Sequence, residues 1–378
     1  MAEFKNSIAQ SNVNFPIETV IVPIAGENYS RGMIFMNIDK KTDCLPGLPT
    51  AKAGDLVELN ANNFQTITGG ALKDWLVPFF TNAATSKIGV ALFDEDDAGG
   101  TPATAPLASV YENKKMYAYF KFGYAEEAKY NALQEQLAGL CKADALYSVL
   151  WVHCFDNQIL AGSSQLMTAL KGNGGRVRVI YNPDKKINAA LAQLGISMSS
   201  VNASGTPVGN SIDMVAFNTI KASGTVDSDG NAANLSATEK AALDGQKVGY
   251  NTWCGDGTEN VVTEGSLYIN GDNVGAEWVK AFIEYSCKVK GASYITRLNT
   301  FNNHETYQGI LLILSSVVEK FTMFGRLSNF TITAPLFEDL PPANGDQIIV
   351  PNAWEATYVD NVREVTVYGK LYLLQPTR

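Results

Sequence analysis

The sequence predicts a protein of mixed α/β and α+β class, in which mixed sheets are flanked by helices. Of its 378 residues, 46% are apolar and 18% are charged, so a folded core is expected. Strand-like and helix-like segments alternate between residues 116 and 217, a pattern typical of parallel βαβ units. Beyond residue 273, two helix-like segments precede strand-like ones, which favours an α+β arrangement for the end of the chain.

A chain of this length is expected to form about two or three domains. Shifts in composition and clusters of turn residues divide the sequence into five regions. They are an N-terminal arm (1–24), a β-rich region (25–110), an α/β domain (111–222), a surface loop with a short helix (223–248) and a C-terminal α+β domain (249–378).

The first strand-like segment, residues 15–24 (FPIETVIVPI), has β-branched residues between two prolines. Proline donates no backbone hydrogen bond, so this segment suits a sheet edge, in its own chain or in a neighbouring one. The four acidic residues at 94–97 lack the spacing of a calcium loop and are expected to form a solvated turn. Between these segments the sequence predicts strands at 33–38, 56–59 and 87–93 and a helix at 71–80.

The middle of the chain alternates regularly between the two element types. Its strand-like segments are rich in β-branched or aromatic residues, and its helix-like segments carry apolar residues at helical spacing. The predicted strands are 116–124, 146–152, 176–181 and 212–217, and the predicted helices are 125–141, 157–171 and 185–194. In the loop region that follows, Ser236 and Glu239 have the spacing of a capping box, which predicts a short helix at 237–243. A strand at 261–269 is expected next.

The C-terminal region contains the clearest helix, residues 304–324. Asn303 is placed to cap its start, and Gly325 is placed to end it in a left-handed conformation. The helix contains the run ILLIL, which is apolar nearly all round, so we expect it to be covered on more than one side. Its inward residues are expected to be Tyr307, Ile310, Leu311, Leu314, Val317, Val318, Phe321 and Phe324.

A second amphipathic helix and several strands complete this region. The second helix is predicted at 274–290, with an apolar set of Trp278, Val279, Phe282, Ile283 and Val289. After Gly325 the spacing of apolar residues falls to two, so Phe330, Ile332 and Ala334 are expected to share one face of a strand. The chain closes with predicted strands at 346–350 and 363–374.

Composition and charge disfavour several classes of partner. The formal net charge is −9 and Lys and Arg do not cluster, which argues against nucleic acid. The sequence has no apolar run of about 18 residues, so no membrane insertion is expected. The polar N-terminus lacks the apolar core of an export signal. The five scattered cysteines are expected to be reduced, buried thiols of a chain made in the cytoplasm.

No motif in the sequence supports catalysis. His153 and Cys154 are adjacent in a strand-like segment, so their side chains are expected on opposite faces and cannot form a dyad. The glycines at 172–175 lie between a helix and a strand, the reverse of a phosphate-binding loop, and are expected to end the helix. Asp156 closes a strand as a nucleotide-binding acid would, which leaves a nucleotide-binding α/β enzyme or a hydrolase as an alternative. We expect no catalytic residue, no cofactor and no metal ion.

Four segments of the C-terminal third follow one another in a distinctive order. A glycine-bearing strand precedes a helix rich in aromatic residues (VVTEGSLYINGDNVGAEWVKAFIEY), and an aromatic–asparagine segment opens the next helix (TFNNHETYQGI). That helix ends in glycine before a strand (FGRLSNFTI), and the chain finishes in a strand (VREVTVYGKLYLL). In the order and residue composition of these segments, residues 249–374 resemble the tail sheath proteins of contractile bacteriophage tails and related contractile injection systems. Residues 146–183 are also similar to the sheath core.

The resemblance implies a structural virion protein rather than an enzyme. Tail sheath subunits form a helical assembly of stacked rings around an inner tail tube, and contraction drives the tube through the host envelope. The expected partners are other copies of the chain, the tail tube protein, and the baseplate and tail terminator proteins. The expected location is the phage tail of the virion, after assembly in the host cytoplasm.

The resemblance also implies which residues hold the assembly together. A strand from each end of the chain would complete a sheet in a neighbouring subunit by β-augmentation. The residues expected in these linking strands are Ile17, Val20, Ile21, Val22, Ile24, Val365, Val367, Tyr368, Leu371 and Leu373. The helix region expected to face the tube contains His304, Glu305, Gln308, Glu319 and Lys320. Alternatives to a sheath subunit are a tail tube or baseplate component, and a carbohydrate- or receptor-binding module that uses exposed Tyr and Trp.

Overall fold

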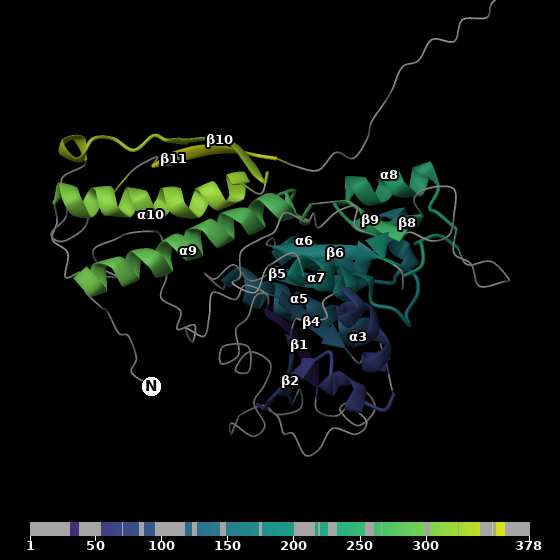
Figure 1. Cartoon of the computed structure of the whole chain (residues 1–378). Helices are drawn as coiled ribbons and strands as arrows, with labels where there is room; N and C mark the ends of the chain where they lie inside the picture. The colour runs from purple at the N-terminus through teal and green to yellow at the C-terminus, as the bar shows by residue number, and fades with distance from the viewer. Residues whose placement is uncertain are drawn as a thin grey trace, which may run out of the picture.

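The structure is a computed structural model, in which the described residues form two units (Figure 1). The described residues are 31–37, 54–69, 71–82, 87–94, 118–122, 127–143, 149–173, 176–199, 216–217, 220–225, 233–253, 261–265, 267–298, 303–323, 325–340, 350 and 353–359. The predicted strands at 15–24 and 363–374 lie outside these residues, as does most of the predicted strand at 346–350.

The first unit is built on a nine-stranded sheet. Its strands are β1 (Arg31–Asn37), β2 (Leu56–Asn60), β3 (Lys87–Phe93), β4 (Ala118–Phe122), β5 (Val149–Cys154), β6 (Val177–Tyr181), β7 (Ala216–Phe217), β8 (Gly249–Trp253) and β9 (Val261–Glu264). They lie in the order β2-β3-β1-β4-β5-β6-β8-β9-β7. The six strands from β3 to β8 are parallel, whereas β2, β9 and β7 pair antiparallel at the two ends. The prediction of a mainly parallel sheet with βαβ units is therefore confirmed.

Helices cover both faces of this sheet. They are α3 (Ala71–Asn82), α5 (Glu127–Ala143), α6 (Gln165–Asn173), α7 (Ala189–Ser199) and α8 (Ala237–Gly245), with short 3-10 helices η2 (Asn63–Thr66) and η3 (Asn157–Ala161). α3 and α7 pack on one face with Ile34 and Met36, and α5 and α6 pack on the other with Met33 and Phe35. Because helices cover both faces, β3 and β6 are almost entirely buried, and their residues are mostly apolar, with Arg178 of β6 as an exception.

Local hydrogen bonds explain where the predicted helices of the first unit were wrong. The predicted helix at 157–171 is two elements, because Gly162 adopts a left-handed φ of 71° and ends η3 before α6 begins. The predicted helix at 185–194 starts later, at Ala189, where the Asn188 carboxamide accepts a hydrogen bond from the Leu191 amide at 2.9 Å. The capping box of Ser236 and Glu239 at the start of α8 is confirmed.

The second unit contains α9 (Val274–Leu298), α10 (His304–Met323), β10 (Leu327–Ile332), the 3-10 helix η4 (Phe337–Asp339) and β11 (Trp354–Tyr358). Figure 1 shows α9 leaving the sheet, α10 returning beside it, and β10 and β11 lying along α10. Their shared core is a separate apolar cluster of both helices and both strands. The predicted helix cap at Asn303 is confirmed by a 2.9 Å hydrogen bond from the Thr306 amide. The predicted left-handed end at Gly325 is confirmed by a φ of 69°.

Two expectations for this unit were wrong. The ILLIL run is not covered on more than one side, because Leu312 at its centre is 70% exposed. The alternation of β10 fails at Asn329, which has a φ of 52° at an irregularity in the β10–β11 register, and Ile332 is consequently exposed rather than inward. One sheet also contains strands from both sides of residues 110 and 248, so those predicted region boundaries do not separate sheets.

Gly195 offers a test of the helix layer on the sheet. It lies where α7 crosses α3, and a Cβ built on it would come within 2.7 Å of the Phe79 carbonyl oxygen. Gly195→Ala must push the two helices apart, and we expect it to lower the free energy of unfolding by about 1–3 kcal/mol. Gly172→Ala in α6 is the control, because its Cβ would meet nothing within 4 Å. Chemical denaturation giving equal unfolding midpoints for both variants would contradict this packing.

Candidate functional site

The two residues that sequence analysis considered for nucleophilic chemistry lie on opposite faces of β5. His153 is fully buried, with its ring centroid 6.3 Å from that of Trp75 on α3. Cys154 belongs to the opposite core, under α5 and α6. The prediction that these neighbours cannot form a dyad is therefore confirmed.

Burial dominates the electrostatics of His153. Among the described residues, no group lies within strict hydrogen-bond geometry of either ring nitrogen. Burial lowers its pKa to about 4, while the Asp184 backbone and carboxylate favour the charged form more weakly. A ring with this pKa is neutral at pH 7 and is enclosed by aromatic side chains, so His153 acts as a packing residue.

Asp156, the alternative nucleotide-binding acid, has a local structural role. Its carboxylate accepts a hydrogen bond from the Gln158 amide at 2.8 Å and caps η3. Among the described residues, no group of three or more His, Cys, Asp or Glu is placed to hold a metal ion. No described helix is both long and apolar enough to cross a membrane.

A polar cluster joins α8 to β8 and β9. Glu264 accepts a hydrogen bond from the Tyr250 hydroxyl at 2.9 Å and pairs with Lys240 at 3.1 Å. Burial, and then the nearby Glu264 charge, raises the pKa of Asp244. Because Lys240 of α8 pairs with Glu264 of β9, we interpret the cluster as the attachment of α8 to the sheet. No sequence motif marks it, since its members are brought together only by the fold.

The β10–β11 sheet is the strongest candidate for an assembly site. Its inner side, with Trp354, Ala356 and Tyr358, packs against the helices, and its outer side carries exposed Thr331 and Glu355. The two strands are its only members among the described residues. A two-stranded sheet is marginal alone, and its outer edges are the usual place for a further strand to add. The linking-strand residues predicted at both ends of the chain lie outside the described residues.

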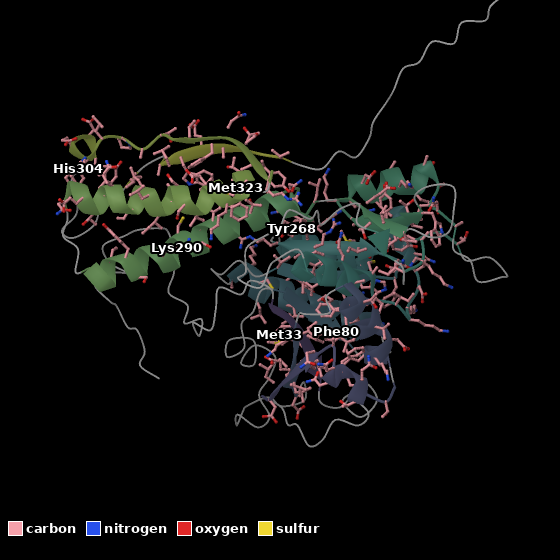
Figure 2. The ribbon with its side chains drawn as sticks, in the orientation of Figure 1. Met33, Phe80, Tyr268, Lys290, His304 and Met323 are labelled. Atoms are coloured by element: carbon pink, nitrogen blue, oxygen red, sulfur yellow. The ribbon has the colours of Figure 1, made fainter. Side chains whose placement is uncertain are left out.

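The residues predicted to face a tube lie on the outward side of α10. His304, Glu305, Gln308 and Glu319 are exposed, and Lys320 is half-buried. Sequence analysis missed two apolar residues on the same helix, Leu312 and Met323, which are 70% and 83% exposed. Figure 2 labels His304 and Met323 at opposite ends of α10. The helical spacing could have identified Leu312, which falls opposite the buried residues.

A short strap covers the N-terminal end of α10. The Tyr307 hydroxyl donates a hydrogen bond to the Pro335 carbonyl, and the Phe337 ring packs edge-on against His304 with centroids 6.1 Å apart. Leu336 in this strap is 69% exposed. Of the large apolar side chains exposed among the described residues, all but Val77 lie in the second unit. The second unit therefore contains the edges of the β10–β11 sheet and most of the large apolar side chains that are exposed among the described residues.

The buried neutral His153 predicts an acid-sensitive contribution to stability. Its pKa is about 4 in the folded chain and 6.5 for the free side chain, so below pH 6.5 the unfolded state binds the extra proton. Stability is therefore lost as the pH falls from 6.5 to 4, by about 3 kcal/mol from this residue. His153→Phe removes the effect, and the check is the free energy of unfolding of both proteins across this range. Curves of the two proteins that run parallel would contradict the prediction.

No protein-family profile matches the chain, and no curated protein matches it in sequence. Solved structures do match. One chain from the six-fold symmetrised baseplate of the anti-feeding prophage aligns with a TM-score of 0.63 and 12% identity, over 94% of this chain and 98% of that chain. A chain from the contracted PVC sheath complex, an extracellular contractile injection system, aligns with a TM-score of 0.64 and 10% identity, over 94% and 95%.

A third solved structure, the sheath tail protein Lin1278 from Listeria innocua, aligns less closely. Its TM-score is 0.47 at 9% identity, over 80% of this chain and 87% of that chain. The two stronger matches cover nearly the full length of both aligned chains. Their sequence identities of 12% and 10% support a shared fold and no more. The chain therefore has the fold of the sheath proteins of contractile injection systems.

Proposed function

We propose that this chain is a structural subunit of a contractile tail sheath. The observation that carries the proposal is the shared fold with a contracted sheath complex, which extends over 94% of this chain and 95% of the other. A role in a large assembly also suits the exposed apolar side chains of the second unit. In this role the protein catalyses no reaction, and its chemistry is self-association.

The proposed mechanism of assembly is strand exchange between copies. The residues near 17–24 and 365–374 of neighbouring subunits extend the β10–β11 sheet from two strands to more. Each backbone hydrogen bond added in this way contributes about 0.5–1.5 kcal/mol, so a strand of several residues gives a strong but directional link. Backbone hydrogen bonds between strands do not depend on side-chain identity. The subunits can therefore stay joined while their relative orientation changes. Contraction needs no nucleotide if the extended lattice stores the strain at assembly.

In the proposed particle, subunits polymerise as stacked rings around an inner tube, with the outward side of α10 toward that tube. Glu305 and Glu319 are exposed there and would meet a complementary positive surface on the tube protein. The other partners would be baseplate and tail terminator proteins at the ends of the tail. The protein would then be part of the virion tail.

A baseplate subunit with a sheath fold is the second candidate, because one match is a chain of the anti-feeding prophage baseplate. The two roles differ in polymerisation. A sheath subunit repeats along the tail and forms long tubes, whereas a baseplate subunit occurs in one ring. Electron microscopy of the purified chain distinguishes long tubes from single rings.

Truncation tests the linking strands. Deletion of residues 1–24, or of residues 363–378, is expected to abolish long polymers because a strand donor is lost. Matched controls are deletions of residues 1–14 and 375–378, which keep both predicted strands. The measurement is negative-stain electron microscopy of each purified variant. Full-length polymers from both of the larger deletions would contradict the proposed strand exchange.

Charge reversal tests the proposed tube-facing helix. Glu305→Lys combined with Glu319→Lys should weaken binding to the tail tube about fivefold or more, by placing positive charge on a positive surface. Self-polymerisation should be unchanged, because both side chains are exposed on α10 and belong to neither strand of the β10–β11 sheet. Glu135→Lys on the exposed face of α5 is the control. Co-sedimentation with tail tubes gives the readout, and unchanged binding by the double variant would assign the tube contact elsewhere.

A further inference from the structure

Arg178 is a buried, positively charged residue of the nine-stranded sheet. It lies on β6 and is 0% exposed. Its Nη1 donates a hydrogen bond to the Leu267 carbonyl at 2.9 Å, and its Nη2 donates to the Gly265 carbonyl. Its Nε donates to the Gln193 side chain on α7 at 3.3 Å. One guanidinium therefore connects the sheet, a helix that covers it, and the segment that follows β9.

Two glycines make room for this side chain. A Cβ built on Gly249 of β8 would come within 2.6 Å of the Arg178 Nη2. Gly265 adopts a left-handed φ of 87°, which turns the chain out of β9 and presents its carbonyl to the guanidinium. Gly249 leaves space beside β8, and the Arg178 guanidinium fills that space. Gly265 ends β9 at the same place.

The segment that Arg178 contacts leads from β9 into α9, the first helix of the second unit. The Ile269 amide donates to the Val177 carbonyl of β6 at 3.0 Å, and Tyr268 is buried in the core under α3 and α7. The carboxamide of Asn273 then accepts a hydrogen bond from the Ala276 amide and caps α9. Figure 2 labels Tyr268 where α9 leaves the sheet. The direction of α9 is therefore decided within a few residues of the Arg178 contacts.

We propose that Arg178 is a positioning residue that fixes the direction of α9 relative to the nine-stranded sheet. A buried guanidinium is costly unless its donors are satisfied, and the 265–267 segment supplies two of its acceptors. Any tilt of α9 that moves this segment takes two hydrogen-bond acceptors away from the buried guanidinium. The junction between β9 and α9 consequently has one favoured arrangement. That arrangement also determines where α10, β10 and β11 lie relative to the nine-stranded sheet. This inference holds whether or not the chain forms a sheath.

Amide hydrogen exchange tests the inference directly. In Arg178→Met the charge and its hydrogen bonds are lost while the volume of the side chain is nearly kept. We expect the Tyr268 and Ile269 amides to exchange at least roughly tenfold faster, because local opening no longer breaks charge-assisted hydrogen bonds. The Asn182 amide, which donates to the Cys154 carbonyl between β5 and β6, should keep its rate.

Two further variants separate positioning from general stability. Arg176→Gln is the matched control, because Arg176 is partly exposed and lies 3.8 Å from Glu277 beside the same junction. It should change exchange at Tyr268 and Ile269 less than threefold. Gly249→Ala displaces the guanidinium without removing its charge and should reproduce the Arg178→Met pattern, which keeps the test decisive if Arg178→Met fails to fold. The proposal would be overturned if Gly249→Ala left the exchange rate of the Ile269 amide unchanged. It would also be overturned if Gly249→Ala raised the exchange rate of the Asn182 amide as much as that of the Ile269 amide.

Discussion

Backbone hydrogen bonding at the edges of strands is the constraint on which this structure depends. In the nine-stranded sheet this constraint is met for every parallel strand, and among the described residues only the short antiparallel strands β2 and β7 have an outer edge. The β10–β11 sheet satisfies it only between its own two members among the described residues. Its inner face is nevertheless well packed, with Trp354, Ala356 and Tyr358 against the helices. A two-stranded sheet with a packed inner face and unpaired outer edges among the described residues is suited to accept strands from other chains.

The rest of the chain places that sheet where other molecules can reach it. α9 has 25 residues and is about 37 Å long, so it carries the second unit well beyond the first. Figure 1 shows the resulting separation of the β10–β11 sheet from the nine-stranded sheet. A rigid start to α9 at the Arg178 junction means that this reach has a defined direction. In the proposed assembly, the second unit would carry the surface for association.

Glycine is used at the helix crossing within the second unit. A Cβ built on Gly309 of α10 would come within 2.2 Å of the Tyr294 hydroxyl of α9. A Cβ built on Gly275 near the start of α9 would meet the Tyr358 hydroxyl of β11 at 2.1 Å. The hydroxyl end of each tyrosine can therefore come close to a helix backbone, which brings the two helices and β11 close together. The small core of this unit depends on such close approach because it has few large residues to bury.

Local signals in the sequence were sufficient for much of the fold. Asn303 and Gly325 marked the ends of α10, Ser236 and Glu239 marked the start of α8, and the alternation of strands and helices predicted the parallel sheet. These features depend on neighbouring residues alone. The position of β1 between β3 and β4 could not be predicted, because strand order depends on contacts between distant segments.

Features that oppose local patterns were also missed. Arg178 alternates with valines in β6 and looks like a solvent-facing position, yet the second face of β6 is covered by α7. Asn329 interrupts the period of β10 by adopting a left-handed conformation, which asparagine tolerates better than most residues. The terminal linking strands were predicted only through a family resemblance and lie outside the described residues, and the β10–β11 sheet was not predicted as an assembly site. No residue pattern reveals that a strand lacks partners until its neighbours in space are known.

The central claim is that the β10–β11 sheet is completed by strands from other copies of the chain. A cryo-electron microscopy reconstruction of the polymer formed by the purified protein tests it most directly. The account predicts additional strands hydrogen-bonded to an outer edge of β10 or β11, with density that traces to the first or last residues of a neighbouring subunit. A polymer in which both edges remain unpaired, with each subunit's termini folded onto itself, would contradict it.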